Sequence, residues 1–297
     1  MSSPVHAEYY VPAQSRWPIF ASVALAFLAF GAATLINAVS QGATIQYGFF
    51  LVMTGALLLT LILFGWFGNV ISESRAGLYS EQMDRSFRLG MVWFIFSEVM
   101  FFAAFFGALF YVRTLAVPWL GGEGEKGVSQ MLWPQFNAAW PLMETPDNAQ
   151  FPGPAETISP WHIPLLNTVL LVTSSLTVTL AHHALLREDR QKLKQWLMAT
   201  IGLGVVFIFF QGYEYAEAYH ELGLTLNAGI YGATFFFLTG FHGLHVTLGA
   251  LMLFIMLMRV LRGHFDPKHH FAFEAVTWYW HFVDVVWIGL FLFVYVI

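Results

Sequence analysis

The stretch Met91–Val112, MVWFIFSEVMFFAAFFGALFYV, decides the fold. It is about the length that a helix needs to cross the hydrocarbon core of a bilayer. Glu98 is its only acidic or basic side chain, roughly 15 Å of helix rise beyond Arg88. A carboxylate at that depth costs about 2.5–3.5 kcal/mol, so it normally faces protein, water or a partner. Two interpretations stay open: an acid that locks two helices together, or an acid kept for proton or lipid-headgroup chemistry.

The composition is that of a membrane protein. Of the 297 residues, 58% are hydrophobic and only 10% are charged, whereas soluble domains carry about 25% charged residues. The mean hydropathy is +0.63. The chain has no cysteine, which excludes disulfides, thiolate nucleophiles and cysteine metal sites.

Seven apolar runs are each long enough to span a membrane, which predicts an all-α polytopic membrane protein. The expected spans are Pro18–Val39, Tyr47–Phe67, Met91–Val112, Leu165–Leu186, Trp196–Tyr215, Ile230–Met258 and Ala275–Ile297. We treat residues 1–297 as a single membrane domain, in which residues 18–67 form the first two helices and residues 91–297 the other five. Residues 1–17 are expected to be a cytoplasmic tail without a cleaved signal, and residues 69–90 a charged connector.

One connector is far longer than the others. Residues 115–164 hold eight of the twelve prolines and four tryptophans, which predicts a long outer loop. Loops of this length are usually functional or disordered. Its tryptophans suit the headgroup layer of a membrane or the surface of a partner.

Positive charge fixes the expected topology. With seven spans, eleven of the thirteen Lys and Arg residues fall in the N-terminal tail and in the connectors after spans two, four and six. Only Arg113 and Lys126 remain for the other side. Because basic loops stay in the cytoplasm, the N-terminus is expected to be cytoplasmic and the C-terminus outside.

Polar side chains recur in the last two spans. His242 and His245, in GFHGLHV, are three residues apart and project from nearly one helix face. Such a pair can bind a metal or haem, but it needs further ligands, so we favour hydrogen bonds to another span near Glu98. His281 and Asp284, in WHFVDVVW, repeat the spacing. The carboxyl can orient the imidazole or share a proton with it, and a purely structural pair is the plainer alternative.

Several function classes find no support. The sequence has no Gly-rich phosphate loop, no Ser–His–Asp spacing, no CxxCH haem attachment and no basic stripe for nucleic acid. An independent proton or solute transporter stays open, although no inverted repeat is visible. A membrane haem or metal oxidoreductase built on the histidine pair is a further alternative. The chain has a few buried acids and histidines but no complete set of catalytic residues, which instead indicates one subunit of a larger protein complex.

The chain closely resembles subunit III of the haem–copper cytochrome c oxidases in four regions. These are FIFSEVMFFAAFFGALFY (Phe94–Tyr111), PLLNTVLLVTSS with AHHAL (Pro164–Ser175, Ala181–Leu185), GIYGATFFFLTGFHGLHV (Gly229–Val246) and HHFAFEAVTWYWHFVDVVW (His269–Trp287). The resemblance extends from about Trp17 to Ile297, and seven spans with a cytoplasmic N-terminus is also that family's plan. The shorter quinol-oxidase relatives look like five-span proteins.

The resemblance implies an accessory, non-redox subunit of an aerobic respiratory-chain oxidase, which passes electrons from cytochrome c to oxygen and pumps protons. The subunit would have no catalytic centre and no bound metal, with haem and copper held in partner subunits. It would stabilise oxidase subunit I, contact subunit II, meet cytochrome c only indirectly, and support proton uptake. Its two plus five helices would surround a V-shaped cleft filled with structural phospholipids, in a bacterial inner (cytoplasmic) membrane. Subunit III of a quinol oxidase or nitric oxide reductase is the alternative.

The resemblance also implies roles for single residues. Glu98 falls on the family's carbodiimide-reactive carboxyl, and one of the mid-membrane histidines is expected to reach it. The expected buried, proton-associated groups are Glu98, His242, His245, His281 and Asp284.

Lipid headgroups are the expected ligands of Trp66, Glu73 and Arg259. The sequence departs from the family at Gly68 and Asn69, where an arginine or an acid often stands. The loop over residues 115–164 is longer than the mitochondrial form. It is expected to contact subunit II or its cytochrome c region, or to cover part of the outer face.

Overall fold

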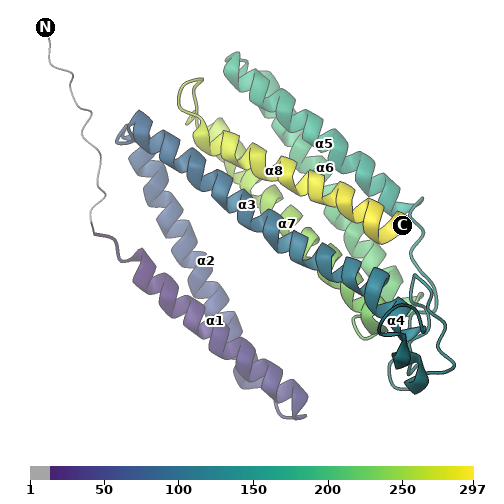
Figure 1. Ribbon diagram of the computed structural model, residues 1–297. Helices are drawn as coiled ribbons and strands as arrows, with labels where there is room; N and C mark the ends of the chain where they lie inside the picture. Colours follow the sequence, from purple (N-terminus) through teal and green to yellow (C-terminus); the bar gives the residue numbers. More distant parts are fainter. Residues whose placement is uncertain (1–13) are drawn as a thin grey trace, which may run out of the picture. The chain divides into compact units, whose positions relative to one another are not determined.

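The computed structural model describes residues 14–297 (Figure 1), so most of the tail expected over residues 1–17 lies outside the described residues. Within that range seven helices are long and apolar enough to cross a membrane, which confirms the all-α polytopic fold. They are α1 (Trp17–Ser40), α2 (Gln46–Arg75), α3 (Glu81–Tyr111), α5 (Ile163–Leu186), α6 (Arg190–His220), α7 (Gly229–Leu261) and α8 (Phe271–Leu290). The π-helical turns η1 (Val112–Ala116) and η3 (Phe291–Val296) and the short α4 (Val117–Leu120) extend α3 and α8.

The helices continue past the apolar runs into charged sequence. Helix α2 ends at Arg75 and α3 begins at Glu81, so most of the connector expected over residues 69–90 is helical. Helix α6 begins in the basic segment at Arg190, where the Asp189 carboxylate caps it by accepting a hydrogen bond from the Lys192 backbone N–H at 3.0 Å. Hydropathy marks only the hydrocarbon-embedded part of a helix, because backbone hydrogen bonding continues into the headgroup layer.

The chain divides into two compact units, Met1–Phe87 and Arg88–Ile297. The first holds α1, α2 and the first turns of α3, and the second holds the remaining helices. This division agrees with the expected two plus five helices. The lipid-filled cleft stays a prediction.

Small residues join α1 and α2, which run side by side in Figure 1. Gly48 and Gly55 are buried on α2, seven residues apart. A Cβ atom at Gly55 would lie 2.8 Å from the Leu28 backbone nitrogen and 2.9 Å from the Ala24 carbonyl oxygen. The two backbones are therefore in contact at this position, which is how helices gain packing energy in lipid.

Trp280 joins four helices of the second unit. Its indole is fully buried, and Cβ atoms at Gly204 of α6 and Gly249 of α7 would each lie 2.8 Å from it. Its Nε1–H donates to the Ser174 hydroxyl of α5 at 2.9 Å. Helix α8 is thereby fixed against α5, α6 and α7.

The connectors of the second unit gather at its two ends. The Arg190 guanidinium donates to the Phe265 carbonyl oxygen at 3.4 Å, which joins the α5–α6 turn to the α7–α8 turn. At the other end the long loop after α4 packs on the α6–α7 turn, where the Ala155 N–H donates to the Leu222 carbonyl oxygen at 3.0 Å. Successive helices of this unit therefore alternate in direction.

Substitution of Gly55 tests the close approach of α1 and α2. We expect Gly55→Ala to lower the free energy of unfolding by about 1–3 kcal/mol, because the new methyl group meets backbone atoms that cannot move aside cheaply. The measurement is an SDS titration of the purified full-length chain, followed by circular dichroism. Gly68→Ala on the same helix is the control, since a Cβ there meets nothing within 4 Å. Equal losses in the two variants would show that the helices are not in contact at Gly55.

Candidate functional site

Glu98 and His245 form a hydrogen-bonded pair inside the five-helix unit. The Glu98 carboxyl, midway along α3, lies 3.0 Å through Oε2 from the Nε2 of His245, midway along α7. Their side chains are 22% and 11% exposed, respectively. The acid that sequence analysis placed in mid-membrane therefore has a protein partner, and of the two neighbouring histidines it is His245 that reaches it.

The hydrogen bond between Glu98 and His245 can form in two protonation arrangements. His245 Nδ1 lies 2.6 Å from the Phe241 carbonyl oxygen, which can only accept, so Nδ1 carries a hydrogen. Nε2 then either accepts from a protonated Glu98 or donates to the Glu98 carboxylate. Both arrangements are neutral overall, which keeps the cost of the pair low in a membrane. The geometry allows one proton to move between a carboxyl and an imidazole without net charge entering the bilayer.

Aromatic rings enclose the imidazole. The Phe102 ring lies edge-on to His245 with centroids 5.0 Å apart, and the Phe101 ring centroid is 6.0 Å away. The Tyr279 ring stacks on the imidazole with centroids 6.4 Å apart, and its hydroxyl donates to the backbone carbonyl oxygen of His245 at 3.4 Å. These contacts hold the imidazole in place, and Glu98 is the more accessible member of the pair.

His242 has different neighbours from His245. It is fully buried, and its Nε2–H donates to the Val283 carbonyl oxygen of α8 at 3.2 Å. Its ring centroid is 5.0 Å from that of Trp287. The two histidines thus do not converge on a common ligand. Among residues 14–297 no group of three His, Cys, Asp or Glu side chains could hold a metal ion.

His281 is held mainly by hydroxyl groups of α5. Its Nδ1 lies 2.7 Å from the Ser175 hydroxyl oxygen and its Nε2 lies 3.3 Å from that of Thr179. The distance from Nδ1 to the nearer Asp284 carboxyl oxygen is 3.9 Å, which is too long for a hydrogen bond. The expected pairing of His281 with Asp284 is therefore loose, and the two residues form a site separate from Glu98 and His245.

The three candidate lipid ligands have unlike surroundings. Trp66 is exposed on α2, and the Glu73 carboxylate on the same helix accepts a hydrogen bond from the Tyr79 hydroxyl at 2.8 Å. Arg259, in the last turn of α7, is buried with its guanidinium carbon 4.4 Å from the centre of the Phe265 ring. Trp66 and Glu73 belong to the first unit, and Arg259 to the second.

Sequence analysis missed two acids that take part in buried contacts. Glu214 is fully buried and accepts a hydrogen bond from the Tyr295 hydroxyl at 2.6 Å. The expected fifth span ended at Tyr215, which placed Glu214 near the surface, whereas α6 continues to His220. The spacing of Gln211 and Glu214, three residues apart on one helix face, was the available signal.

The other missed acid is Glu274 of α8. Its carboxylate pairs with the Arg88 guanidinium of α3 at 2.6 Å. The partners are 186 residues apart in the chain, and no local sequence pattern predicts a contact over that separation.

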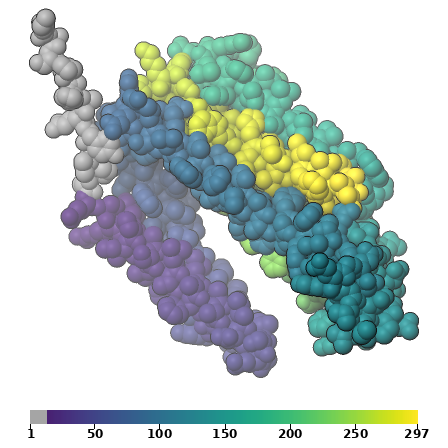
Figure 2. Space-filling model, in the orientation of Figure 1, coloured from purple at the N-terminus to yellow at the C-terminus, as the bar shows by residue number. Residues whose placement is uncertain are grey.

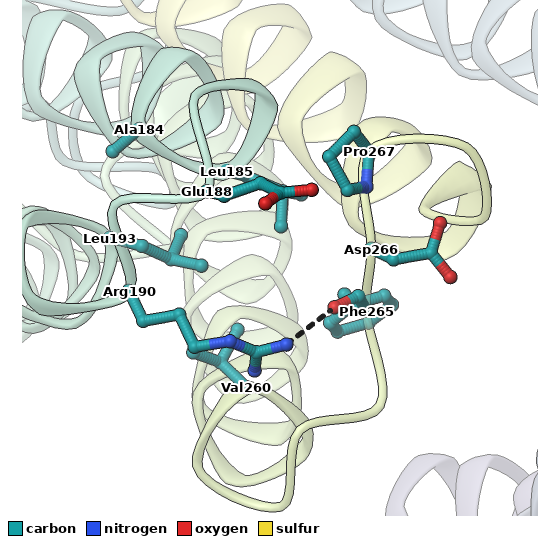
Figure 3. Close-up of a pocket in the computed structure, with 9 residues that line it drawn as sticks. All are labelled: Ala184, Leu185, Glu188, Arg190, Leu193, Val260, Phe265, Asp266 and Pro267. Carbon is teal, nitrogen blue, oxygen red and sulfur yellow. Dashed lines mark hydrogen bonds between the residues drawn. The ribbon is translucent and has the colours of Figure 1, made fainter.

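A recess of about 180 Å³ lies at the ends of the helices rather than at their middle. Figure 3 shows the Glu188 and Asp266 carboxylates on two different turns, with the Arg190 guanidinium directed at the Phe265 carbonyl group. Slight burial acts to raise the pKa of Asp266, but the backbone N–H groups of Lys268 and His269 outweigh it and the pKa falls below its usual value. The recess contains none of the candidate site residues that sequence analysis named.

Comparison with known proteins gives consistent matches along nearly the whole chain. The family described as Cytochrome c oxidase subunit III matches residues 6–128 and 127–297. The chain is 37% identical over 296 residues to Cytochrome c oxidase subunit 3 of Oncorhynchus mykiss, covering 99% of this chain and 98% of that protein. The Gadus morhua protein of the same name is also 37% identical with the same coverage. The Hippopotamus amphibius protein is 36% identical over 299 residues, again covering 99% and 98%.

A double-mutant cycle tests the pair. We expect Glu98→Ala and His245→Ala to be coupled by about 0.5–2 kcal/mol in the free energy of unfolding, because each single variant leaves its partner without a hydrogen bond in the membrane. The SDS titration described above measures it. A cycle of Glu98→Ala with His242→Ala is the control and should give coupling near zero. Equal coupling to both histidines would contradict the assigned contact.

Proposed function

The chain belongs to the cytochrome c oxidase subunit III family, and we propose that it stabilises the catalytic subunit of its oxidase and holds an exchangeable proton and phospholipids beside it. It is an accessory subunit of a respiratory-chain oxidoreductase and has no catalytic centre of its own. Its partners are therefore other subunits of that oxidase. We propose subunit I as the main partner and subunit II as the second, with cytochrome c meeting the complex elsewhere.

The contact of Glu98 with His245 carries the proposal. A family member without a redox centre can affect turnover only through packing, lipid or protons, and this pair contributes to two of these. Its hydrogen bond joins α3 to α7, and its shared proton is exchangeable through the partly exposed Glu98. His242 supports it by fixing α7 on α8 through the Val283 carbonyl group. His281 and Asp284 lie apart from it and have a structural role.

Phospholipid binding is proposed at Trp66, Glu73 and Arg259. An exposed indole on α2 and a carboxylate about two turns further along the helix suit the boundary between acyl chains and headgroups. Arg259 lies at the end of α7, where a guanidinium can pair with a phosphate group.

We propose that the chain lies in a bacterial inner membrane with its N-terminus in the cytoplasm and its C-terminus in the periplasm. The distribution of lysine and arginine supports this orientation. The quinol-oxidase alternative has lost its support, because the relatives matched over 98% of their length are named cytochrome c oxidase subunit 3.

Carbodiimide labelling tests the role of Glu98. We expect Glu98→Gln to assemble into the oxidase, because the amide still forms a hydrogen bond with His245, and to lose labelling of this chain. Asp284→Asn is the control and should keep the label, since its carboxyl group is buried. The measurement is mass spectrometry of the labelled peptides. Labelling that persists in Glu98→Gln would identify a different reactive carboxyl group.

Removal of the chain tests its part in turnover. We expect an oxidase without it to show the same haem and copper spectrum and a similar initial rate of oxygen consumption. Its activity should then decline with the number of turnovers, because the catalytic subunit has lost a packing partner. An oxygen electrode follows the decline, and adding back the purified chain should slow it. An unchanged lifetime would contradict the stabilising role.

A further inference from the structure

The 3₁₀-helix η2 (Gly127–Leu132), in the long outer loop, exposes apolar side chains outside the membrane-spanning helices. Val128, Met131 and Leu132 are 67%, 80% and 75% exposed, respectively. In a 3₁₀-helix, residues three apart lie one above the other, so Val128 and Met131 share a face and Leu132 lies beside it. We call these three side chains the η2 face. Adjacent exposed apolar side chains outside the spans indicate a surface that binds something other than water.

The η2 face is held in place at the end of the third span. Helix η2 packs on α4, which continues α3 through η1, and Figure 2 shows this segment in dark teal at the end of the five-helix unit. Gly127 lies against the Gly122 carbonyl group and has no room for a Cβ atom. The Lys126 ammonium lies 4.5 Å from the centre of the Trp119 ring of α4. The η2 face therefore belongs to a turn that is fixed on a membrane-spanning helix.

The level of η2 is that of the lipid headgroups. Arg113 is the first charged residue after the third span, and α4 begins four residues later, at Val117. Four residues add about 6 Å of helix rise. The headgroup layer on each side of a bilayer is roughly 5–7 Å thick. Because η2 packs beside α4, its side chains are within reach of the boundary between headgroups and acyl chains.

Aromatic contacts connect η2 with the surface that α3 presents in the membrane. Tyr111, the last residue of α3, is exposed, and its ring centroid lies 5.9 Å from that of Trp119. Trp119 in turn contacts Lys126, the residue before η2. Lysine and tryptophan next to apolar side chains are typical of segments that lie in the membrane interface. This continuity favours lipid over a protein partner as the cover of the η2 face.

We propose that η2 anchors the outer loop in the membrane. The η2 face inserts between the phospholipid headgroups of the leaflet in which α3 ends, and Lys126 lies at the level of their phosphate groups. The anchor holds the loop over residues 115–164 on the membrane surface instead of in the water above it. It uses none of the residues to which phospholipid binding was assigned above, and it does not depend on which subunit is the main partner.

Spin labelling of a single cysteine tests the depth of η2. The chain has no cysteine, so Met131→Cys gives one attachment site for a nitroxide. The labelled full-length chain is added back to an oxidase that lacks it, in vesicles of phosphatidylcholine and phosphatidylglycerol. Power-saturation EPR compares collisions with oxygen, which concentrates in hydrocarbon, and with a water-soluble nickel chelate. We expect the label at Met131 to collide more often with oxygen. Gln135→Cys, exposed in the same loop just beyond η2, is the control and should show the opposite preference.

A charged substitution tests whether the apolar side chains hold η2 at that depth. The label is moved to Val128→Cys, and Met131→Glu is added. We expect the ratio of oxygen to nickel collisions at Val128 to fall several-fold, because a carboxylate is costly among acyl chains and draws the turn into water. Gln135→Glu is the matched control and should leave the ratio unchanged.

Two results would overturn the anchor. A label at Met131 that prefers the nickel chelate, as the label at Gln135 should, would place η2 in water. A label that is immobile and that neither reagent reaches would show that a protein subunit covers the η2 face. If the chain with Met131→Cys does not join the oxidase, the same measurement with Leu132→Cys decides.

Discussion

Trp280 sets the register of the helices on which everything else depends. Its indole fills the space left by two glycines, Gly204 and Gly249, and its N–H is anchored on Ser174. In lipid no hydrophobic force drives helices together, so tight packing and a hydrogen bond have to select the arrangement. With α8 fixed in this way, the His245 side chain of α7 lies against α3, where it meets Glu98.

Helix α3 is attached by side chains rather than by close contact of backbones. Aromatic contacts such as that of Phe101 with Phe241, at 5.0 Å between centroids, fill the space between α3 and α7. Two polar contacts fix its position: Glu98 with His245 in mid-membrane, and Arg88 with Glu274 towards one end. The two interpretations of the acid in mid-membrane are therefore compatible, because the hydrogen bond that attaches α3 to α7 also involves the proton to which we assign an exchangeable role.

Hydropathy was enough to predict seven spans, because burying twenty or so apolar residues in lipid outweighs every local preference. The cost of a buried charge likewise identified Glu98 before any contact was known. The hydrogen-bond partner of each polar side chain was less predictable, because it depends on which helices become neighbours. His281 was expected to pair with Asp284, yet Ser175 of α5 is closer to it. Glu214 was overlooked because the charged end of α6 concealed how far that helix continues.

The polar groups of the second unit differ in whether this chain satisfies them. Trp280 and Glu98 have partners here, so their hydrogen bonds specify how the subunit folds. Neither carboxyl oxygen of Asp284 accepts a hydrogen bond from the described residues, and the His281 imidazole lies 3.9 Å away. Apolar surface cannot tell a neighbouring subunit from lipid, because both present hydrocarbon. A hydrogen bond makes a distinction that apolar contact does not, so the few polar side chains with a partner on another helix specify which helices of this unit become neighbours.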